Sequence, residues 1–177
     1  MAPSPQTLLS HSPQNAGGLN ENSDASTPPP SSSAPSAITF DVIGMDPATQ
    51  GSKRHVGNGI MRETNARLPA WRSTIANTAL ATNYSLTTAP VSISIVFRFL
   101  RPKGHYNKSG LSPKAPLHLT SKQKGDIDKL SRAVLDALTG TLLHDDSQVV
   151  QLSAHKRYTT PDERPGALIT IIPLAAT

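Results

Sequence analysis

The sequence predicts an α+β domain in which a small mixed β-sheet packs with two helices, in the order β-α-β-α-β-β, preceded by a disordered N-terminal tail. Three observations support this fold class. Apolar and polar residues alternate over 91–99, as in a half-buried strand. Apolar residues recur at helical spacing over 68–81 and over 126–138. An apolar run over 167–172 is typical of a buried strand.

Residues 1–37 have the composition of a disordered tail. They contain 9 Ser and 7 Pro but few side chains that could form a core, so the entropy lost on ordering them would not be offset. We therefore expect a disordered tail over 1–37 and one domain over 38–177.

The first part of the domain is predicted to form a strand, a loop and a helix. Apolar residues alternate with polar ones over 38–43, which indicates a short strand. Residues 44–59 are expected to form a basic loop. The segment 68–81 is predicted to be a helix, because Pro69 suits a first turn and three apolar side chains share one face. These side chains are Trp71, Ile75 and Ala79.

The second part starts with a long connection over 101–124, which leads to the second helix over 126–138. Gly140 is expected to end this helix. Two further strands are predicted over 148–155 and 167–172. The apolar stripe of the helix consists of Ile127, Leu130, Val134 and Leu138.

The composition excludes several classes of protein. The chain has no Cys, so disulfide scaffolds, thiolate zinc sites and cysteine nucleophiles are ruled out. No run approaches the ~18 apolar residues of a membrane helix, and no Lys or Arg precedes the weak apolar pair Leu8-Leu9, as a secretory signal would require. We expect a soluble, intracellular protein without a membrane partner.

The charge distribution favours a polyanionic partner. All 17 Lys and Arg lie in 38–177, against 10 Asp and Glu there, and the pI is about 9.7. The connection over 101–124 contains no acidic residue at all, and connections this long are usually functional or disordered. Nucleic acid is the simplest partner of this kind, and an inert basic surface is the alternative.

Half of the acidic residues of the domain gather in one short stretch, and all of them are Asp. Short carboxylates close to the backbone favour rigid coordination of a hard cation such as Mg²⁺. Such an ion stabilises the attacking and leaving oxygens when a phosphodiester is hydrolysed. The five residues are Asp126, Asp128, Asp136, Asp145 and Asp146.

Two alternatives exist for these pairs. Residues i and i+2 of a helix do not face each other, so Asp126 and Asp128 converge only if Asp126 precedes the helix, which Gly125 allows. Alternatively, this pair caps the helix and Asp145-Asp146 forms a polar turn. The two pairs bracket one helix directly after a basic connection without acids, and this arrangement favours a metal site.

A stripe of Asp128, Arg132 and Asp136 follows the same helix at i, i+4 and i+8. It is either a surface ion-pair ladder or a functional row. In the functional interpretation, Arg132 lies beside the metal carboxylates and faces a phosphate oxygen, and Asp136 orients Arg132 without binding the metal.

The segments 125–138 (GDIDKLSRAVLDAL) and 142–150 (LLHDDSQVV) together resemble the RusA family of Holliday junction resolvases of bacteria and their phages. The family pattern is roughly D-x-D-N-x-x-K, then D-A-L, then D-D-x-Q-V. The resemblance implies a homodimeric, Mg²⁺-dependent endonuclease, with Mn²⁺ as an alternative ion, that makes paired nicks in four-way DNA junctions during recombination and repair.

By position, Asp126, Asp128 and Asp146 correspond to the essential carboxylates of the family, and the resemblance implies that they are the metal ligands. Asp145 lies next to them as an accessory carboxylate. The basic side chains expected to hold the backbone of branched DNA are Lys53, Arg54, Arg101, Lys103, Lys108, Lys114, Lys122 and Lys124.

Two positions depart from the family pattern. Lys129 stands where the family has Asn, and Arg132 stands where it has a catalytic Lys. Arginine keeps the charge but is effectively never deprotonated. Arg132 therefore suffices if only a cation is needed, whereas a proton transfer would fall to Lys129. The alternatives are a catalytically impaired branched-DNA-binding protein of the same fold, a nuclease with another substrate, and a basic structural protein.

Overall fold

The computed structural model describes residues 36–51, 53–55, 57, 59–63 and 65–175, with the side chains of 53–55 and 61–63 left out. The prediction of a disordered tail falls almost wholly on residues outside this part, and only residues 36 and 37 of it are described. They form no regular structure before the first strand.

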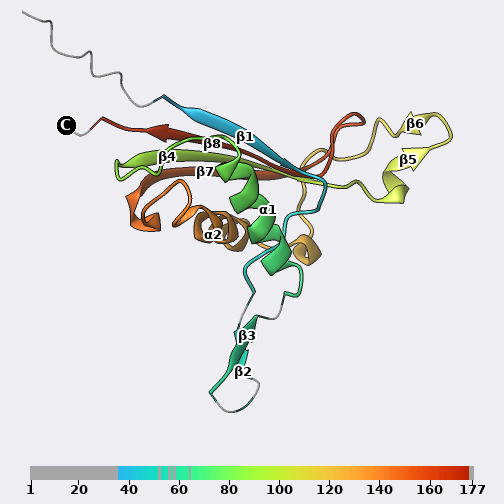
Figure 1. Ribbon diagram of the computed structural model, residues 1–177. Helices are drawn as coiled ribbons and strands as arrows, with labels where there is room; N and C mark the ends of the chain where they lie inside the picture. Colours follow the sequence, from blue (N-terminus) through green and yellow to red (C-terminus); the bar gives the residue numbers. More distant parts are fainter. Residues whose placement is uncertain (1–35, 52, 56, 58, 64, 176–177) are drawn as a thin grey trace, which may run out of the picture. The chain divides into compact units, whose positions relative to one another are not determined.

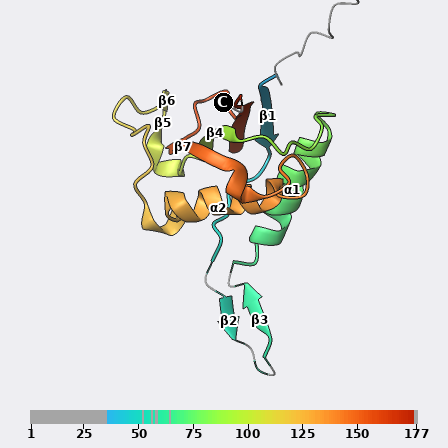
Figure 2. The same cartoon turned by 90° about the vertical axis from the view of Figure 1, so that its left-hand side faces the viewer.

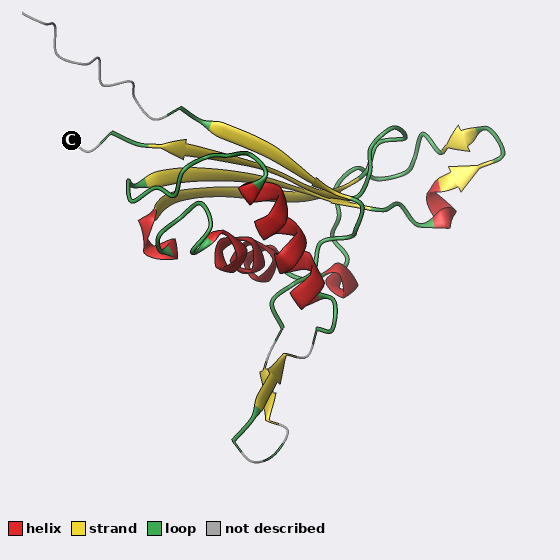
Figure 3. Ribbon diagram, in the orientation of Figure 1, coloured by secondary structure: helices red, strands yellow, loops and turns green. Residues whose placement is uncertain are grey.

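The sheet has four strands in the order β1-β8-β4-β7. They are β1 (Ile38–Ile43), β4 (Val91–Phe99), β7 (Val149–Tyr158) and β8 (Gly166–Pro173). β7 pairs parallel with β4, whereas β8 pairs antiparallel with both β4 and β1, so the sheet is mixed (Figures 1 and 3). β7 is an edge strand, and residues 117–119 hydrogen-bond to the end of its outer side at Lys156 and Tyr158. The earlier part of that side is left open to a further partner.

Two helices cover one face of this sheet, α1 (Leu68–Leu80) and α2 (Ile127–Leu138). Figures 1 and 2 show both helices on the same side of the strands. Trp71, Ile75 and Ala79 are completely buried against the sheet, as their shared helix face predicts. The α+β class and the order β-α-β-α-β-β of the main elements are therefore confirmed.

The buried stripe of α2 begins one turn later than the sequence indicates. Leu130, Val134 and Leu138 are fully buried, but Ile127 remains 38% exposed. Ile127 lies in the first turn and lines an open hollow between α2 and β7, the last strand of the sheet in the described part of the chain.

Two short hairpins interrupt segments that the sequence indicates as loops. β2 (Lys53–His55) pairs with β3 (Met61–Glu63), and β5 (Tyr106–Asn107) pairs with β6 (Gly110–Leu111). Short 3₁₀ turns, η1 (Lys103–His105), η2 (Lys122–Lys124) and η3 (Asp146–Gln148), occupy further connecting segments. Strands of two or three residues are too short for alternation to be visible, so periodicity does not detect them.

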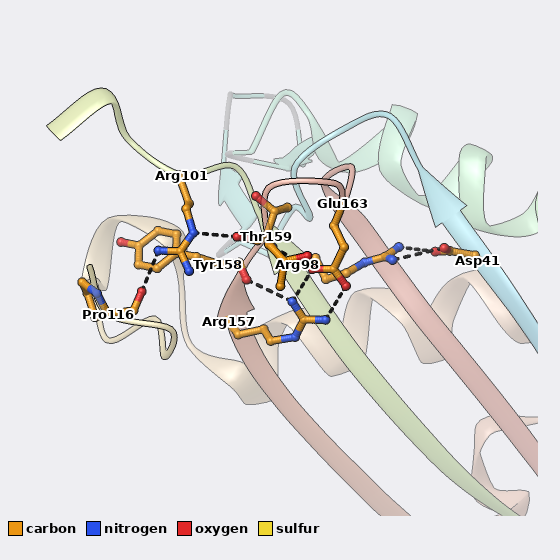
Figure 4. A network of polar contacts seen from close by, with 9 residues as sticks. Asp41, Arg98, Arg101, Pro116, Arg157, Tyr158, Thr159 and Glu163 are labelled. Carbon is orange, nitrogen blue, oxygen red and sulfur yellow. Dashed lines mark hydrogen bonds and ion pairs between the residues drawn. The ribbon is translucent and has the colours of Figure 1, made fainter. Parts of the chain in front are cut away.

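Arginine side chains join the strands on the open face of the sheet (Figure 4). Arg98 of β4 is only 7% exposed, and its guanidinium binds both carboxylate oxygens of Asp41 on β1. Arg157 of β7 donates to Glu163 in the turn that leads to β8, at 2.5 and 2.6 Å. These hydrogen bonds lower the pKa of Glu163 to about 2, so the ion pair persists in mild acid.

Within the described residues, no helix combines the length and the apolar character needed to cross a membrane.

Candidate active site

Asp126 occupies the position immediately before α2. Its backbone is extended, at φ −82° and ψ 148°, and its carbonyl accepts the first hydrogen bond of the helix, from Leu130 N–H at 3.1 Å. Its carboxylate makes no capping hydrogen bond. Asp126 therefore occupies the N-cap position of α2, as the capping alternative expects, but its side chain does not cap the helix. Its non-helical backbone satisfies the condition for pairing with Asp128.

Gly125 creates this geometry. Its φ is +88°, and a Cβ at this position would lie 2.0 Å from Cγ2 of Thr49. Its carbonyl accepts a hydrogen bond from Nζ of Lys156 on β7, which ties the start of α2 to the sheet. The sequence gives no indication of this role of Lys156, because 31 residues separate it from its partner Gly125.

Gly125→Ala is expected to destabilise the fold by about 2–4 kcal/mol for two reasons. Alanine is strained at a positive φ, and its methyl group would clash with Thr49. Chemical unfolding would measure the loss. Gly104→Ala is the matched control, since a Cβ there meets nothing within 4 Å, and it should change stability by less than about 0.5 kcal/mol. Equal stability of the two variants would contradict the packing of Gly125 on Thr49.

The first turn of α2 presents carboxylates and cations to solvent. Oδ2 of Asp126 lies 3.2 Å from Nζ of Lys129, an exposed pair. Asp128 and Arg132 line a shallow hollow of about 380 Å³ between α2 and β7. Within the described part of the chain, neither of these two side chains forms a hydrogen bond or ion pair, so both are available to a ligand.

Asp136 does not orient Arg132, contrary to the prediction. Its carboxylate binds Nη2 of Arg72 on α1, and that guanidinium also donates to Oε1 of Gln50 at 3.0 Å. The side chain therefore fixes α2 against α1. The alternative of an ion-pair ladder is also wrong, because no ion pair joins Asp128, Arg132 and Asp136.

Asp145 and Asp146 have different surroundings. Asp145 caps η3 through a capping box. Its carboxylate accepts a hydrogen bond from Ser147 N–H at 2.9 Å, and the backbone N–H of Asp145 donates to Oε1 of Gln148 at 2.8 Å. Hydrogen bonding from Ser147 lowers the pKa of Asp145. The capping alternative therefore holds for Asp145, whereas Asp146 is exposed in the first position of η3.

Gln148 holds this turn in place, a role that the sequence analysis does not identify. Its Nε2 donates to the carbonyls of Thr87 and Ala89, at 3.0 and 2.9 Å, just before β4 begins. Asp146 is thus fixed at the end of the sheet where β4 and β7 start.

The three carboxylates expected to bind one metal ion do not meet in one chain. Asp126 and Asp128 lie at the amino-terminal end of α2, and Asp146 follows its carboxy-terminal end. The 12 residues of this helix span about 18 Å. The described residues contain no group of three or more acidic or His side chains that could hold a metal ion. Within the described part of one chain, these three carboxylates therefore do not converge on one ion.

Arg101 anchors the basic connection instead of facing solvent (Figure 4). It is 7% exposed, and it donates from Nε to the Thr159 carbonyl at 2.6 Å and from Nη1 to the Pro116 carbonyl at 2.9 Å. Its guanidinium also lies 5.5 Å from the ring centre of Tyr158. These contacts engage Nε and Nη1 and bury the side chain, so the structure gives Arg101 a role within the fold in place of the exposed position expected of it.

The other basic residues expected to bind DNA differ in whether their side chains form ion pairs within the protein. Lys124 binds Asp46 at 2.5 Å and lies over the ring of Phe99. The side chains of Lys53 and Arg54 lie outside the described part, although the backbone of both belongs to β2. Four lysines of the connection are exposed and form no ion pair within the described residues: Lys103, Lys108, Lys114 and Lys122.

The α+β fold with its mixed sheet carries exposed carboxylates at the start of a helix and a cationic connection. These features are typical of proteins that bind the phosphodiester backbone of nucleic acids. The family model described as Endodeoxyribonuclease RusA matches residues 45–172, which include both helices, the basic connection and all five aspartates discussed above. The chain therefore belongs to the RusA endodeoxyribonuclease family, a family of nucleases. None of the curated proteins compared with the chain matches it.

Proposed function

We propose that the protein is a homodimeric, Mg²⁺-dependent endonuclease that resolves four-way (Holliday) DNA junctions by paired nicks, in recombination and repair in the bacterial or phage-infected cytoplasm. The family match over 45–172 carries this proposal, because it covers every residue of the candidate site. Mn²⁺ is the alternative ion.

Backbone recognition falls to the exposed lysines of the connection, Lys103, Lys108, Lys114 and Lys122, together with Lys53 and Arg54. Each contact with a phosphate releases a counterion, so affinity falls as salt rises. The absence of any acid from 101–124 supports this role, since nothing in that segment would repel the phosphates.

We infer that the metal site needs two chains. Asp126 and Asp128 of one chain and Asp146 of its partner supply the carboxylates. In a dimer whose two-fold axis is perpendicular to α2, the two helices run antiparallel, and the amino-terminal end of one lies beside the carboxy-terminal end of the other. The separation that α2, about 18 Å long, imposes between these carboxylates within one chain is then closed between chains.

The surface between α2 and β7 suits such a contact. Leu152 and Val150 on β7 are 44% and 63% exposed, and Ile127 on α2 is exposed beside them. The hollow of about 380 Å³ between the two elements is lined largely by apolar side chains. On the side of β7 that faces away from β4, residues 117–119 cover its end through hydrogen bonds to Lys156 and Tyr158, but within the described residues no strand pairs with the earlier part of this outer side.

The bound ion would supply a nucleophilic water and charge neutralisation at the scissile phosphate. The carboxylate of Asp126 makes no capping hydrogen bond, and Asp128 lines the α2–β7 hollow together with Arg132. Arg132 carries a fixed positive charge toward a phosphate in that hollow. Lys129, which already contacts Asp126, is the side chain that can hold or release a proton.

A second candidate function is branched-DNA binding without cleavage. The observation that favours it is Arg132, which cannot transfer a proton at the position where the family has Lys. Lys129 beside Asp126 favours the nuclease.

The test is cleavage of a synthetic four-way junction, with a linear duplex of the same sequence as control. We expect paired nicks in the junction when Mg²⁺ is present, no nicks with EDTA, and no cleavage of the duplex. Binding of the junction without nicks in Mg²⁺ or Mn²⁺ would establish the binding protein instead. Binding that is independent of salt would contradict backbone recognition.

A further inference from the structure

One aromatic side chain differs from all the others in its surroundings. The chain has seven Phe, Tyr and Trp residues, and six of them are buried or partly buried. Only Tyr106 is exposed, at 45%. Within the described part of the chain, its ring stacks on no other ring and its hydroxyl forms no hydrogen bond. Folding therefore leaves a planar apolar surface unused at this position.

Tyr106 lies in the most cationic part of the molecule. It begins β5, the first strand of the small hairpin within the connection that has no acids (Figure 3). Lys103 precedes it and Lys108 follows it, and both lysines are exposed. An exposed aromatic side chain near unpaired lysines is the combination with which proteins bind unpaired nucleotides: the cations contact phosphate and the ring stacks on a base.

The hairpin is fixed at its base. The ring of neighbouring His105 meets Tyr158 edge to face, with 4.7 Å between the ring centres, and its Nδ1 lies 3.3 Å from Nη1 of Arg101. The carbonyl of His105 accepts from Ser112 N–H at 2.9 Å, which closes the hairpin. Because the buried Arg101 and the partly buried Tyr158 hold His105, the backbone of the next residue is held in a defined position before any ligand binds.

We propose that Tyr106 stacks on a base exposed at the branch point of the DNA junction and thereby helps to distinguish branched DNA from duplex. This inference rests on the proposed function. Base pairs inside a linear duplex stack on both sides and offer no free face. Where the arms of a junction open at the branch point, the last base pair of each arm loses its stacking neighbour and offers such a face. The lysines serve both substrates, but the ring serves only the branched one.

The experiment compares Tyr106→Ala, Tyr106→Phe and Lys108→Ala by fluorescence anisotropy on a four-way junction and on a duplex, over a range of salt. Tyr106→Ala should weaken junction binding about tenfold, with duplex binding and the salt slope unchanged. Tyr106→Phe should bind like the wild type. Lys108→Ala should weaken binding to both DNAs and reduce the salt slope by about one.

A second readout locates the contact. With 2-aminopurine at the branch point, wild type and Tyr106→Phe should quench its fluorescence, and Tyr106→Ala should not. Three results would overturn the proposal: unchanged junction affinity in Tyr106→Ala, equal losses on junction and duplex, or a shift of the sedimentation coefficient to that of a monomer, which would assign Tyr106 to a protein contact.

These results are separable from failure of the proposed function. If the wild type neither binds nor cuts junctions, the proposed function is wrong and the stacking proposal falls with it. If the wild type cuts junctions and Tyr106→Ala binds them equally well, only the role of Tyr106 is wrong.

Discussion

Asp128→Asn is expected to abolish Mg²⁺-dependent nicking of a four-way junction while junction affinity changes by less than about twofold. Asp128 lies in the first turn of α2, exposed and without a partner among the described residues, so its replacement removes no contact of the fold. A metal ion contributes several kcal/mol to stabilising the charge of the transition state, which corresponds to a loss of about 10³-fold in rate. Gel assays of cleavage and of binding measure the two effects separately.

Asp136→Asn is the matched control, because it makes the same change two turns later on the same helix. Its partner is Arg72 on α1, so the substitution should lower stability by about 1–3 kcal/mol and leave nicking intact below the unfolding temperature. Nicking by Asp128→Asn at the wild-type rate would exclude Asp128 as a metal ligand. Loss of nicking in both variants, with the fold intact, would contradict the division of roles between these two aspartates.

Mixing two inactive variants is expected to restore cleavage. If each metal site combines Asp128 of one chain with Asp146 of its partner, a dimer of Asp128→Asn with Asp146→Asn has one site with both substitutions and one intact site. An equimolar mixture should recover roughly a quarter of the wild-type nicking, since half of the dimers are mixed and each has one working site. The products should be single nicks, because paired nicks need both sites.

The reciprocal mixture provides the control. In a dimer of wild type with the double variant Asp128→Asn/Asp146→Asn, each two-chain site contains one substitution, so the mixed dimers should be inactive. Sites contained within single chains predict the opposite in both mixtures. Different affinity tags on the two chains would verify that mixed dimers form. Active mixed dimers in the reciprocal mixture would overturn the two-chain site.

The sequence predicted the long elements well because they carry their own periodic signal. The alternation over 91–99 and the apolar face of Trp71, Ile75 and Ala79 each depend on burial against one continuous core. The non-helical backbone of Asp126 was also foreseeable, since Gly125 precedes it. The hairpins β2–β3 and β5–β6 were not, because strands of two or three residues show no period.

Local sequence patterns could not predict which residues pair with the charged side chains. Asp136 lies four residues from Arg132 along α2, but its ion pair is with Arg72, 64 residues away. Arg101 resembles the lysines around it in sequence, yet its guanidinium is used inside the fold. Both assignments depend on which segments pack together, and neither spacing nor composition contains that information.

By itself the sequence determined the order of the elements, the excess of positive charge over 38–177 and the aspartate motif that places the chain in its family. Only the tertiary structure decided which of these side chains remain free and how far apart they lie. Two aspartate pairs on either side of a helix are close in sequence, but a helix is a rigid rod and holds its ends about 18 Å apart. Proximity along the chain therefore became separation in space, which a second chain is proposed to close.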